Sequence, residues 1–525
     1  MRRDAGVLLS VTSLPSKYGV GCFDKAAYEF VDFLVDAGQR YWQILPLGAT
    51  SHYGAFDSPY QAYSAFAGNP YFISPDALVK EGLLTEQECL KADFGEDPLH
   101  VNYRKLHENR LALLKKAYDR WDAAACQPYQ DYIRENFWWL DDYALFMALK
   151  DRFDGKSWTQ WPDDIRLRKP EVLKTYGEEL AEPVEFQKFL QYLFFTQWRA
   201  LKQYANDRHV QIVGDIPIYV SPDGSDIWAQ PELFQLDENN IPTQIAGCPP
   251  DSFSADGQVW GNPLYRWEYH RQTGYHWWVT RMWYSYQLYD VVRIDHFRGF
   301  DEYFSIPADT FLAKDGHWEK GPGMELFRTL EANLGRRGVI AEDLGLLTPG
   351  VRQLVKESGF PNMKVLQFAF DETDIGGANE YLPHNYGTNC WVYTGTHDNE
   401  TLAGWFAGLT KGQKNWVREY LEDYRTPGKE MYRRLIGRAM SSTAVSCIVP
   451  VQDWLGLSND ARMNVPGTVD FNWSWRLLPG QLTPELAEEM QKVSKRFGRA
   501  NWDALHQKEA VRWEKVEESK EDAAK

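Results

Sequence analysis

The chain has 525 residues, with 57 Lys and Arg against 74 Asp and Glu, so its formal net charge at pH 7 is -17. Such an acidic chain repels phosphate backbones, which argues against a nucleic-acid partner and favours a neutral ligand. No stretch approaches the roughly 18–20 apolar residues that cross a bilayer, which argues against a membrane partner. The 22 Trp residues suit stacking on sugar rings, although a large core also uses Trp.

The cysteines and the N-terminus predict the compartment. The six cysteines are scattered, with no CxxC pair and no His at zinc spacing. This pattern predicts neither a disulfide framework nor a metal site. The apolar run from Ala5 to Val11 is short and lacks a small-residue cleavage site, so we do not expect it to act as a secretion signal. We therefore expect reduced thiols and a cytoplasmic location.

Eight short apolar segments end in polar or Gly/Pro residues, and amphipathic helical patterns separate many of them. This alternation predicts a parallel sheet that is buried on both faces. Eight strands favour an α/β fold of the (β/α)8 TIM barrel type, with a doubly wound open sheet as the alternative. No Gly-rich phosphate loop follows an early strand, which weighs against a nucleotide-binding sheet. The predicted strands are Gly6–Val11, Tyr41–Leu47, Val210–Val220, Asp290–Phe297, Gly338–Leu344, Met363–Phe370, Cys390–Thr396 and Thr443–Val451. The predicted helices include Phe23–Ala37, Gly323–Leu334 and Lys429–Met440.

Two segments are too long for simple crossovers and predict insertions around the C-terminal mouth of the barrel. Residues 51–205 read as a mainly helical insertion, and residues 221–281 as a loop-rich insertion with an active-site lid around Pro249–Pro263. The barrel itself would comprise residues 1–50 and 206–505, followed by a charged tail over 506–525. The helices expected in the first insertion are Asn102–Asp122, Pro128–Lys150 and Pro183–Asp207.

The first acidic motif is Arg293-Ile294-Asp295-His296, at the end of a predicted strand. Side chains two residues apart on a strand share a face, so Arg293 and Asp295 point together. The guanidinium is expected to lower the pKa of Asp295 and to keep it ionised, as a nucleophile requires. The alternative is a structural Asp–Arg ion pair at the strand end.

The second motif is Ala341-Glu342-Asp343, which ends another apolar strand where barrel enzymes place catalytic groups. Glu342 and Asp343 face opposite sides of a regular strand, so only one of them can enter the cleft. We predict that Glu342 is the general acid, with its pKa raised by burial and by the charge of Asp295. The alternatives are that Asp343 is the acid, or that both residues cap the following helix.

The third motif is Thr396-His397-Asp398-Asn399, which closes a further strand. His397 and Asp398 are expected to bind sugar hydroxyls more tightly as the ring flattens toward an oxocarbenium ion. The alternative is a helix N-cap formed by Asp398 or Asn399. Asp215 ends a fourth strand, where it either lines the same mouth or, as we favour, holds Arg293 in place.

These residues resemble the amylomaltase (4-α-glucanotransferase, disproportionating enzyme) family of the α-amylase clan, over nearly the whole chain. No single motif is specific, but their order over this length is. The motifs are Ser58-Pro59-Tyr60-Gln61, Ser64-Ala65-Phe66-Ala67-Gly68-Asn69-Pro70, Gly214-Asp215-Ile216-Pro217, Gly247-Cys248-Pro249-Pro250-Asp251, Gly257-Gln258-Val259-Trp260-Gly261-Asn262-Pro263, Arg293-Ile294-Asp295-His296-Phe297-Arg298-Gly299, Ala341-Glu342-Asp343-Leu344-Gly345, Gly395-Thr396-His397-Asp398-Asn399 and Arg462-Met463-Asn464-Val465-Pro466-Gly467.

The resemblance implies a retaining transfer of α-1,4-glucan segments, with α-1,4-glucans as both donor and acceptor and no metal or organic cofactor. It implies Asp295 as nucleophile, Glu342 as acid/base and Asp398 as transition-state stabiliser. An α-1,4-glucan hydrolase and a non-catalytic glucan-binding protein are the alternative functions, and no oligomeric state is predicted. The residues that the resemblance places around the sugars are Tyr60, Asp215, Arg293, His296 and His397 at the bond that is cut, Gln258 and Trp260 on a loop over the glucan, and Asn464 at a donor-side unit further along.

Overall fold

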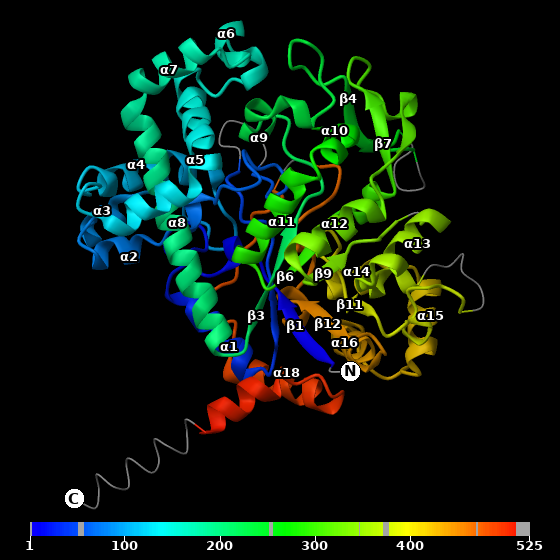
Figure 1. Cartoon of the computed structure of the whole chain (residues 1–525). Coiled ribbons are helices and arrows are strands. Elements are labelled where there is room, and N and C mark those ends of the chain that lie inside the picture. Colours follow the sequence, from blue (N-terminus) through cyan, green and yellow to red (C-terminus); the bar gives the residue numbers. More distant parts are fainter. Residues whose placement is uncertain are drawn as a thin grey trace, which may run out of the picture.

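The computed structural model describes residues 3–50, 57–250, 256–345, 347–370, 377–468 and 471–510. Eight parallel strands close into a barrel in the order β1-β12-β11-β10-β9-β6-β3-β2, so strands adjacent along the chain are adjacent in the barrel (Figure 1). The predicted (β/α)8 barrel is confirmed, and the open doubly wound sheet is wrong. The barrel strands are β1 (Asp4–Leu8), β2 (Tyr41–Gln43), β3 (Gln211–Ile216), β6 (Val291–Ile294), β9 (Gly338–Ala341), β10 (Asn362–Val365), β11 (Cys390–Tyr393) and β12 (Ser446–Pro450).

The barrel strands are shorter than the apolar segments that predicted them. β3 ends at Ile216, because Pro217 has no amide proton to donate to a neighbouring strand. In the predicted strand Met363–Phe370, only the first half belongs to β10. The 3-10 helix η7 (Leu366–Ala369) forms the second half, so that part of the prediction is wrong. An apolar run marks burial rather than extended backbone, and the sequence alone does not separate the two.

Side chains along each strand alternate between the inside of the barrel and the surrounding helices. Val213 and Ile340 belong to a small cluster inside the barrel. Their neighbours Ile212 and Val339 pack outward in the main core. Asp215 and Glu342 lie two positions beyond Val213 and Ile340. By the same alternation, their side chains point toward the inside of the barrel at its mouth.

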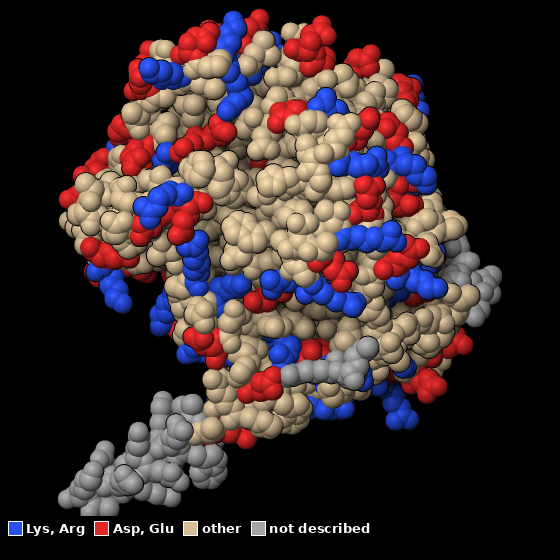
Figure 2. Space-filling model, viewed as in Figure 1, with Lys and Arg blue, Asp and Glu red and all other residues tan. Residues whose placement is uncertain are grey.

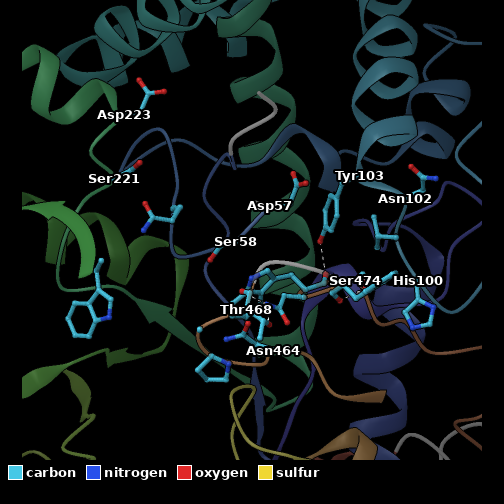
Figure 3. A pocket seen from close by; sticks show the side chains of 18 of the residues that line it. Asp57, Ser58, His100, Asn102, Tyr103, Ser221, Asp223, Asn464, Thr468 and Ser474 are labelled. Carbon is cyan, nitrogen blue, oxygen red and sulfur yellow. Dashed lines mark hydrogen bonds between the residues drawn. The ribbon is translucent and has the colours of Figure 1, made fainter. Parts of the chain in front are cut away.

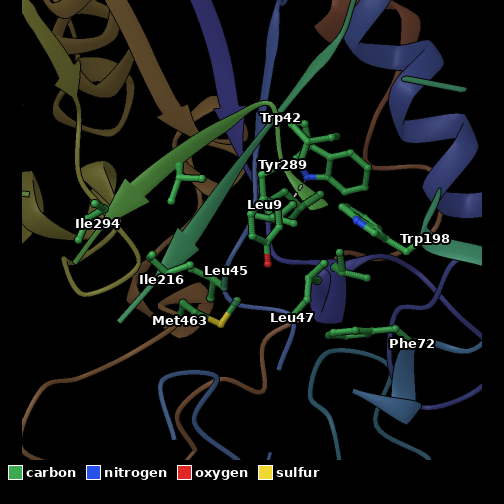
Figure 4. Packing of buried hydrophobic residues seen from close by; sticks show 14 of the residues in the cluster. Leu9, Trp42, Leu45, Leu47, Phe72, Trp198, Ile216, Tyr289, Ile294 and Met463 are labelled. Carbon is green, nitrogen blue, oxygen red and sulfur yellow. Dashed lines mark hydrogen bonds between the residues drawn. The ribbon is translucent and has the colours of Figure 1, made fainter. Parts of the chain in front are cut away.

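Aromatic rings hold the strands from outside (Figure 4). Trp42 and Trp198 are fully buried, and Trp42 Nε1 donates to the carbonyl of Leu9 at 2.8 Å. Gly214 of β3 lets the ring of Tyr289 lie against the strand, since a β-carbon there would stand 2.1 Å from that ring. Close packing against Tyr289 thus fixes the position of β3 near its C-terminal end.

The helices that surround the barrel match the predicted ones to within a few residues at α1, α12 and α16. Helix α1 begins after Asp24, whose carboxylate accepts the amide proton of Ala26, and it buries Phe30 and Leu34 against the strands. The surrounding helices are α1 (Lys25–Asp36), α11 (His276–Leu288), α12 (Met324–Leu334), α13 (Pro349–Ser358), α14 (Leu402–Gly408), α15 (Lys411–Leu421), α16 (Met431–Ser441), α17 (Val451–Trp454) and α18 (Pro484–Arg496).

A group of helices between β2 and β3 stands over one side of the barrel, as Figure 1 shows in colours from blue through cyan to blue-green. The long helices α5 and α8 pack together through aromatic rings, with Trp139 and Phe195 centred 6.1 Å apart. The C-terminal part of α8 leads into β3 and serves as its crossover. The helices of this group are α2 (Pro75–Lys80), α3 (Glu86–Lys91), α4 (Tyr103–Tyr118), α5 (Gln127–Arg152), α6 (Asp163–Arg166), α7 (Pro170–Glu179) and α8 (Ala181–Asp207).

A four-stranded antiparallel sheet stands over the other side, in the order β5-β4-β7-β8. The sequence predicted only loops for part of this region, because the strands are short and β7 and β8 lie beyond β6 in the chain. The short helices α9 and α10 flank β4 and β5 in sequence. These elements are α9 (Ser225–Ala229), β4 (Gln244–Cys248), β5 (Gln258–Pro263), α10 (Trp267–Gln272), β7 (Glu302–Pro307) and β8 (His317–Lys320). The division of the chain into domains stays a prediction, and residues 511–525 of the predicted tail lie outside the described residues.

On the face drawn in Figure 2, basic side chains lie among acidic ones around a broad area of uncharged residues. Within the described ranges, no helix combines the length and the apolar character that a membrane span needs.

Arg499 links the N-terminal ends of β1 and β12. Its side chain is fully buried just after α18. Its guanidinium donates to the main-chain oxygens of Met440 at 2.7 Å, Ala444 at 2.8 Å, Ser442 at 3.1 Å and Asp4 at 3.2 Å. These acceptors precede or begin β1 and β12, so one side chain links the first and the last barrel strand.

We predict that Arg499→Met lowers the free energy of unfolding by about 3 kcal/mol, because it leaves several buried carbonyl oxygens without a donor. Urea unfolding followed by Trp fluorescence measures this loss. Arg496→Met, an exposed site on α18, is the matched control and is expected to change little. Equal losses in the two variants would contradict a role for Arg499 in closing the barrel.

Candidate active site

The predicted residues meet where four barrel strands end. Asp215 and Arg293 are register partners on β3 and β6, and both follow the inward alternation. Ile294 pairs with Ala341 across β6 and β9, so Asp295 and Glu342 come next on two adjacent strands. The amide of Glu342 still donates to the carbonyl of Ile294 at 3.1 Å. The two carboxylates therefore stand side by side at the barrel mouth.

A cavity of about 380 Å³ opens at this mouth. All the predicted site residues line it except Asp215 and Arg293, which lie buried beside it. The predicted residues on its wall are Tyr60, Gln258, Trp260, Asp295, His296, Glu342, His397, Asp398 and Asn464.

Arg293 joins two carboxylates. Its Nη1 lies 2.7 Å from both carboxylate oxygens of Asp215 and 3.1 Å from Oδ1 of Asp295. Burial opposes the charge of Arg293, but the carboxylates of Asp215 and then Asp295 raise its pKa above the ordinary value. Asp215 therefore holds Arg293, which is the supporting position that the sequence favoured.

The pKa of Asp295 differs from the expectation. Burial raises its pKa to about 6, and Arg293 only partly offsets that effect, while the charges of Asp215 and Asp398 add to the rise. The predicted lowering of its pKa is thus wrong, because burial outweighs the single guanidinium. At neutral pH the carboxyl group of Asp295 is nevertheless mostly ionised.

Glu342 is nearly buried and accepts two main-chain hydrogen bonds, from His296 at 2.7 Å and from Leu344 at 2.9 Å. Burial, and next the charge of Asp295, raise its pKa to about 7. Asp343 points elsewhere, since it accepts hydrogen bonds from Asn362 Nδ2 and the Met363 amide. Only Glu342 of the two lines the cavity.

Asp398, unlike Glu342, is held in its ionised form. Its Oδ1 accepts a 2.6 Å hydrogen bond from Asn464 Nδ2, and its Oδ2 lies 3.3 Å from His397 Nε2. Burial favours the neutral acid, but the charge of His397, its hydrogen bond and that of Asn464 prevail and lower the pKa of Asp398 well below its ordinary value. Asp398 is therefore an ionised carboxylate on the cavity wall.

Tyr60 links the carboxylate of Asp215 to that of Asp398 through His397. Its hydroxyl donates to Asp215 Oδ2 at 2.9 Å, so its oxygen accepts from His397 Nε2, also at 2.9 Å. The ring of Tyr60 stacks on that of His397, with centroids 5.2 Å apart. A continuous polar chain thus runs from Asp215 through Tyr60 and His397 to Asp398.

His296 has a left-handed backbone, with φ of 51°, and its ring meets the ring of Trp260 edge-on at 4.8 Å. Burial, and then the nearby charge of Arg298, lower the pKa of His296 to about 3, so the ring is neutral. Its Nε2 is a buried atom that finds no hydrogen-bond partner among the described residues. A buried polar atom without a partner on a cavity wall is free to bind a ligand hydroxyl.

Strand β5 forms another wall of the cavity and lies within the predicted lid. Trp260 Nε1 donates to Gln258 Oε1 at 3.1 Å, which fixes the two side chains together. Residues 251–255 of the predicted lid lie outside the described residues. In the part of the chain that the structure describes, no group of three or more His, Cys, Asp or Glu side chains could hold a metal ion.

Comparison with known proteins decides the family. The model of the 4-alpha-glucanotransferase family matches residues 9–482. The chain belongs to the 4-alpha-glucanotransferase family. A 4-alpha-glucanotransferase of Clostridium butyricum is 46% identical over 495 residues, covering 94% of this chain and 100% of the relative. A Thermus thermophilus 4-alpha-glucanotransferase is 44% identical over 501 residues, covering 94% and 98%. The solved amylomaltase from Streptococcus agalactiae in complex with acarbose is 41% identical with a TM-score of 0.92, covering 95% and 100%. The family predicted from the sequence is confirmed.

This 4-alpha-glucanotransferase family member has site residues that the sequence analysis did not select. The ring of Trp473 lies 5.7 Å from those of both Tyr60 and His397. Asp453 is buried and accepts hydrogen bonds from Thr394 Oγ1 at 2.6 Å and the Leu402 amide at 2.7 Å. It thereby clamps both ends of the loop that carries Asp398. The aromatic run around Trp473 was a usable signal, whereas nothing near Asp453 in the sequence points to the site.

A wider groove of about 1130 Å³ continues outward from the cavity. The two share wall residues, among them Trp260, Asn464 and Trp473. Figure 3 shows the groove between Tyr103 of α4 on one side and the loop with Asp223 on the other. The cavity that holds the carboxylates is therefore continuous with a larger groove.

The raised pKa of Glu342 has a consequence for stability. The folded protein holds this proton up to about pH 7, whereas the unfolded chain releases it near its ordinary value of 4.5. Folding therefore binds a proton in that window, and stability falls as the pH rises through it. The penalty is fully present above the folded pKa and amounts to about 3 kcal/mol at pH 8.

We predict that Glu342→Gln raises the melting temperature relative to the unmodified protein, and that the gain grows from pH 5 to pH 8. Glutamine does not titrate between these pH values, so the change in the gain from pH 5 to pH 8 reports the titration of Glu342. Glu171→Gln on exposed α7 serves as the control. A gain that is the same at both pH values would contradict the raised pKa.

Proposed function

We propose that this chain cleaves an α-1,4-glucosidic bond and transfers the glucan segment to the 4-hydroxyl of another glucan or of glucose. The observation that carries the proposal is the pair Asp295 and Glu342, which share one cavity and differ in protonation. Two carboxyl groups whose environments separate their pKa values are the usual pair for acid/base and nucleophilic work on glycosides.

In the proposed mechanism, Asp295 attacks the anomeric carbon while Glu342 protonates the leaving oxygen. This forms a covalent glucosyl ester, with inverted configuration at that carbon. Glu342 then takes the proton of an incoming 4-hydroxyl, which attacks the ester and restores the α configuration. Such a retaining reaction works best when the two carboxyl groups are about 5–5.5 Å apart. It needs no metal or organic cofactor.

The remaining residues support the charge changes of this reaction. Arg293 keeps a positive charge beside Asp295, which stabilises the carboxylate when it leaves the sugar. Asp398 stays ionised and can stabilise the positive charge of an oxocarbenium-like transition state. The neutral ring of His296 offers its unpartnered Nε2 to a sugar hydroxyl.

Transfer requires that an acceptor sugar reaches the ester before water does. Trp260 and Trp473 line the cavity with apolar rings, and the groove outside gives an acceptor glucan a position to bind. Both features favour transfer over hydrolysis. We also propose that α-1,4-glucans serve as both donor and acceptor. The cytoplasmic location remains a proposal that rests on the scattered cysteines.

Incubation with maltotriose tests the overall reaction. We expect glucose together with a ladder of oligosaccharides longer than maltotriose, measured by chromatography. Glucose and maltose in equal amounts, with no longer product, would instead identify a hydrolase. Binding without any product would identify a glucan-binding protein.

A donor with a good leaving group separates the two proposed roles. We predict that Asp295→Asn abolishes turnover of both maltotriose and an α-glucosyl fluoride, since no ester can form. Glu342→Gln should lose turnover of maltotriose by at least about 10³-fold, but should still form the ester from the fluoride, which needs no acid. Mass spectrometry detects the trapped ester.

Asp343→Asn is the matched control for these variants, because Asp343 adjoins Glu342 in sequence but faces away from the cavity. It is expected to keep most of its activity. If Asp343→Asn were the variant that loses maltotriose turnover and Glu342→Gln retained it, the assignment of the acid would be wrong.

The two pKa values predict a bell-shaped dependence of kcat/KM on pH. Activity should fall below about pH 6 as Asp295 becomes protonated, and above about pH 7 as Glu342 loses its proton. The two limbs belong to the pair as a whole, since the groups interact. Initial rates of glucose release from maltotriose measure the profile. A rate that keeps rising from pH 7 to pH 9 would contradict the assignment of the acid.

A further inference from the structure

Left-handed backbone conformations gather along the active groove. Ten residues other than glycine have positive φ in the described parts of the chain. Four of these, His296, Phe311, Phe471 and Trp473, line the reaction cavity or the groove outside it. Side chains with a β-carbon adopt this conformation at a cost, and bulky rings more so. Strain that persists in a folded protein often marks a ligand-binding position.

Phe311 lies in the segment between β7 and β8, and its φ is 51°. The ring is 56% exposed, although it is a phenyl group on the wall of a groove. Its amide donates to the carbonyl of Pro307 at 3.2 Å. The ring reaches β5, since a β-carbon on Gly261 would lie 3.8 Å from it. Phe311 therefore lies against β5 and lines the outer groove, but not the cavity that holds the carboxylates.

The groove around Phe311 has the chemistry of a sugar site. Besides Phe311 and the 87% exposed ring of Phe471, its wall carries amide and hydroxyl groups. Hydroxyl and amide groups bind sugar hydroxyls, and aromatic rings pack on the apolar C–H faces of sugars. The polar groups include those of Asn102, Tyr103, Ser221, Thr468, Asn472 and Ser474.

We propose that Phe311 is the stacking surface of an outer glucose subsite, which binds a unit of an α-glucan beyond those held in the reaction cavity. The proposal rests on the proposed function, because the groove is continuous with the reaction cavity through Trp260, Asn464 and Trp473. A short oligosaccharide fills the cavity alone, whereas a long one also reaches Phe311. This residue thus gives the enzyme a preference for longer chains, and Phe471 contributes on the same groove.

Titration calorimetry in an Asp295→Asn background tests the subsite without turnover. We expect Phe311→Ala to weaken the binding of maltoheptaose about five-fold, equivalent to roughly 1 kcal/mol, and that of maltotriose less than about two-fold. Phe311→Trp should restore the affinity for maltoheptaose. Leu312→Ala is the matched control, since Leu312 is exposed next to Phe311 but does not line the groove.

Equal losses for the two oligosaccharides, no loss for either, or the same loss in Leu312→Ala would overturn the proposal. The measurement is independent of the transferase reaction. If the unmodified chain made no products from maltotriose while the length-dependent loss persisted, the proposed function would fail and the outer subsite would stand.

Discussion

The site depends on one buried cation held between carboxylates. Arg293 is placed by β6 and bound at 2.7 Å by Asp215 of the neighbouring strand. A buried guanidinium is costly unless it is paired, and removal of its partner would leave an uncompensated charge. Because Asp215 holds it, Arg293 keeps its charge and its position 3.1 Å from the carboxylate of Asp295.

Three neighbouring carboxyl groups are all desolvated by burial, yet they have different pKa values. Asp398 is kept ionised by His397 and Asn464, whereas Glu342 holds its proton to about pH 7. Asp295 lies between these two in pKa. Desolvation acts on all three in the same direction, so the difference comes from the hydrogen bonds and charges that each meets. The raised pKa of Glu342 lowers the free energy of unfolding at higher pH, where the unfolded chain would release that proton more easily.

The structured surface at this mouth extends beyond the three carboxylates. The loop that bears Asp398 is fixed at both ends by Asp453, and the rings of Trp473, Trp260 and Phe311 line a continuous path outward. Phe311 and Trp473 have left-handed backbones that the surrounding packing has to maintain. A rigid barrel with strained loops at its mouth can thus place an oligosaccharide along a path much longer than the bond it cuts.

The eight barrel strands and the three acidic motifs could be predicted from the sequence by itself. Strand alternation, a local property with period two, shows that only one of Glu342 and Asp343 can enter the cleft, but not which one. Only the tertiary structure places Glu342, and not Asp343, on the cavity wall. The sequence did not determine the sheet of β4, β5, β7 and β8, whose partners lie far apart in the chain. It also mistook the direction of the Asp295 pKa shift and did not select Asp453 and Trp473. Burial, electrostatic balance and long-range contacts are sums over residues that only the tertiary structure brings together.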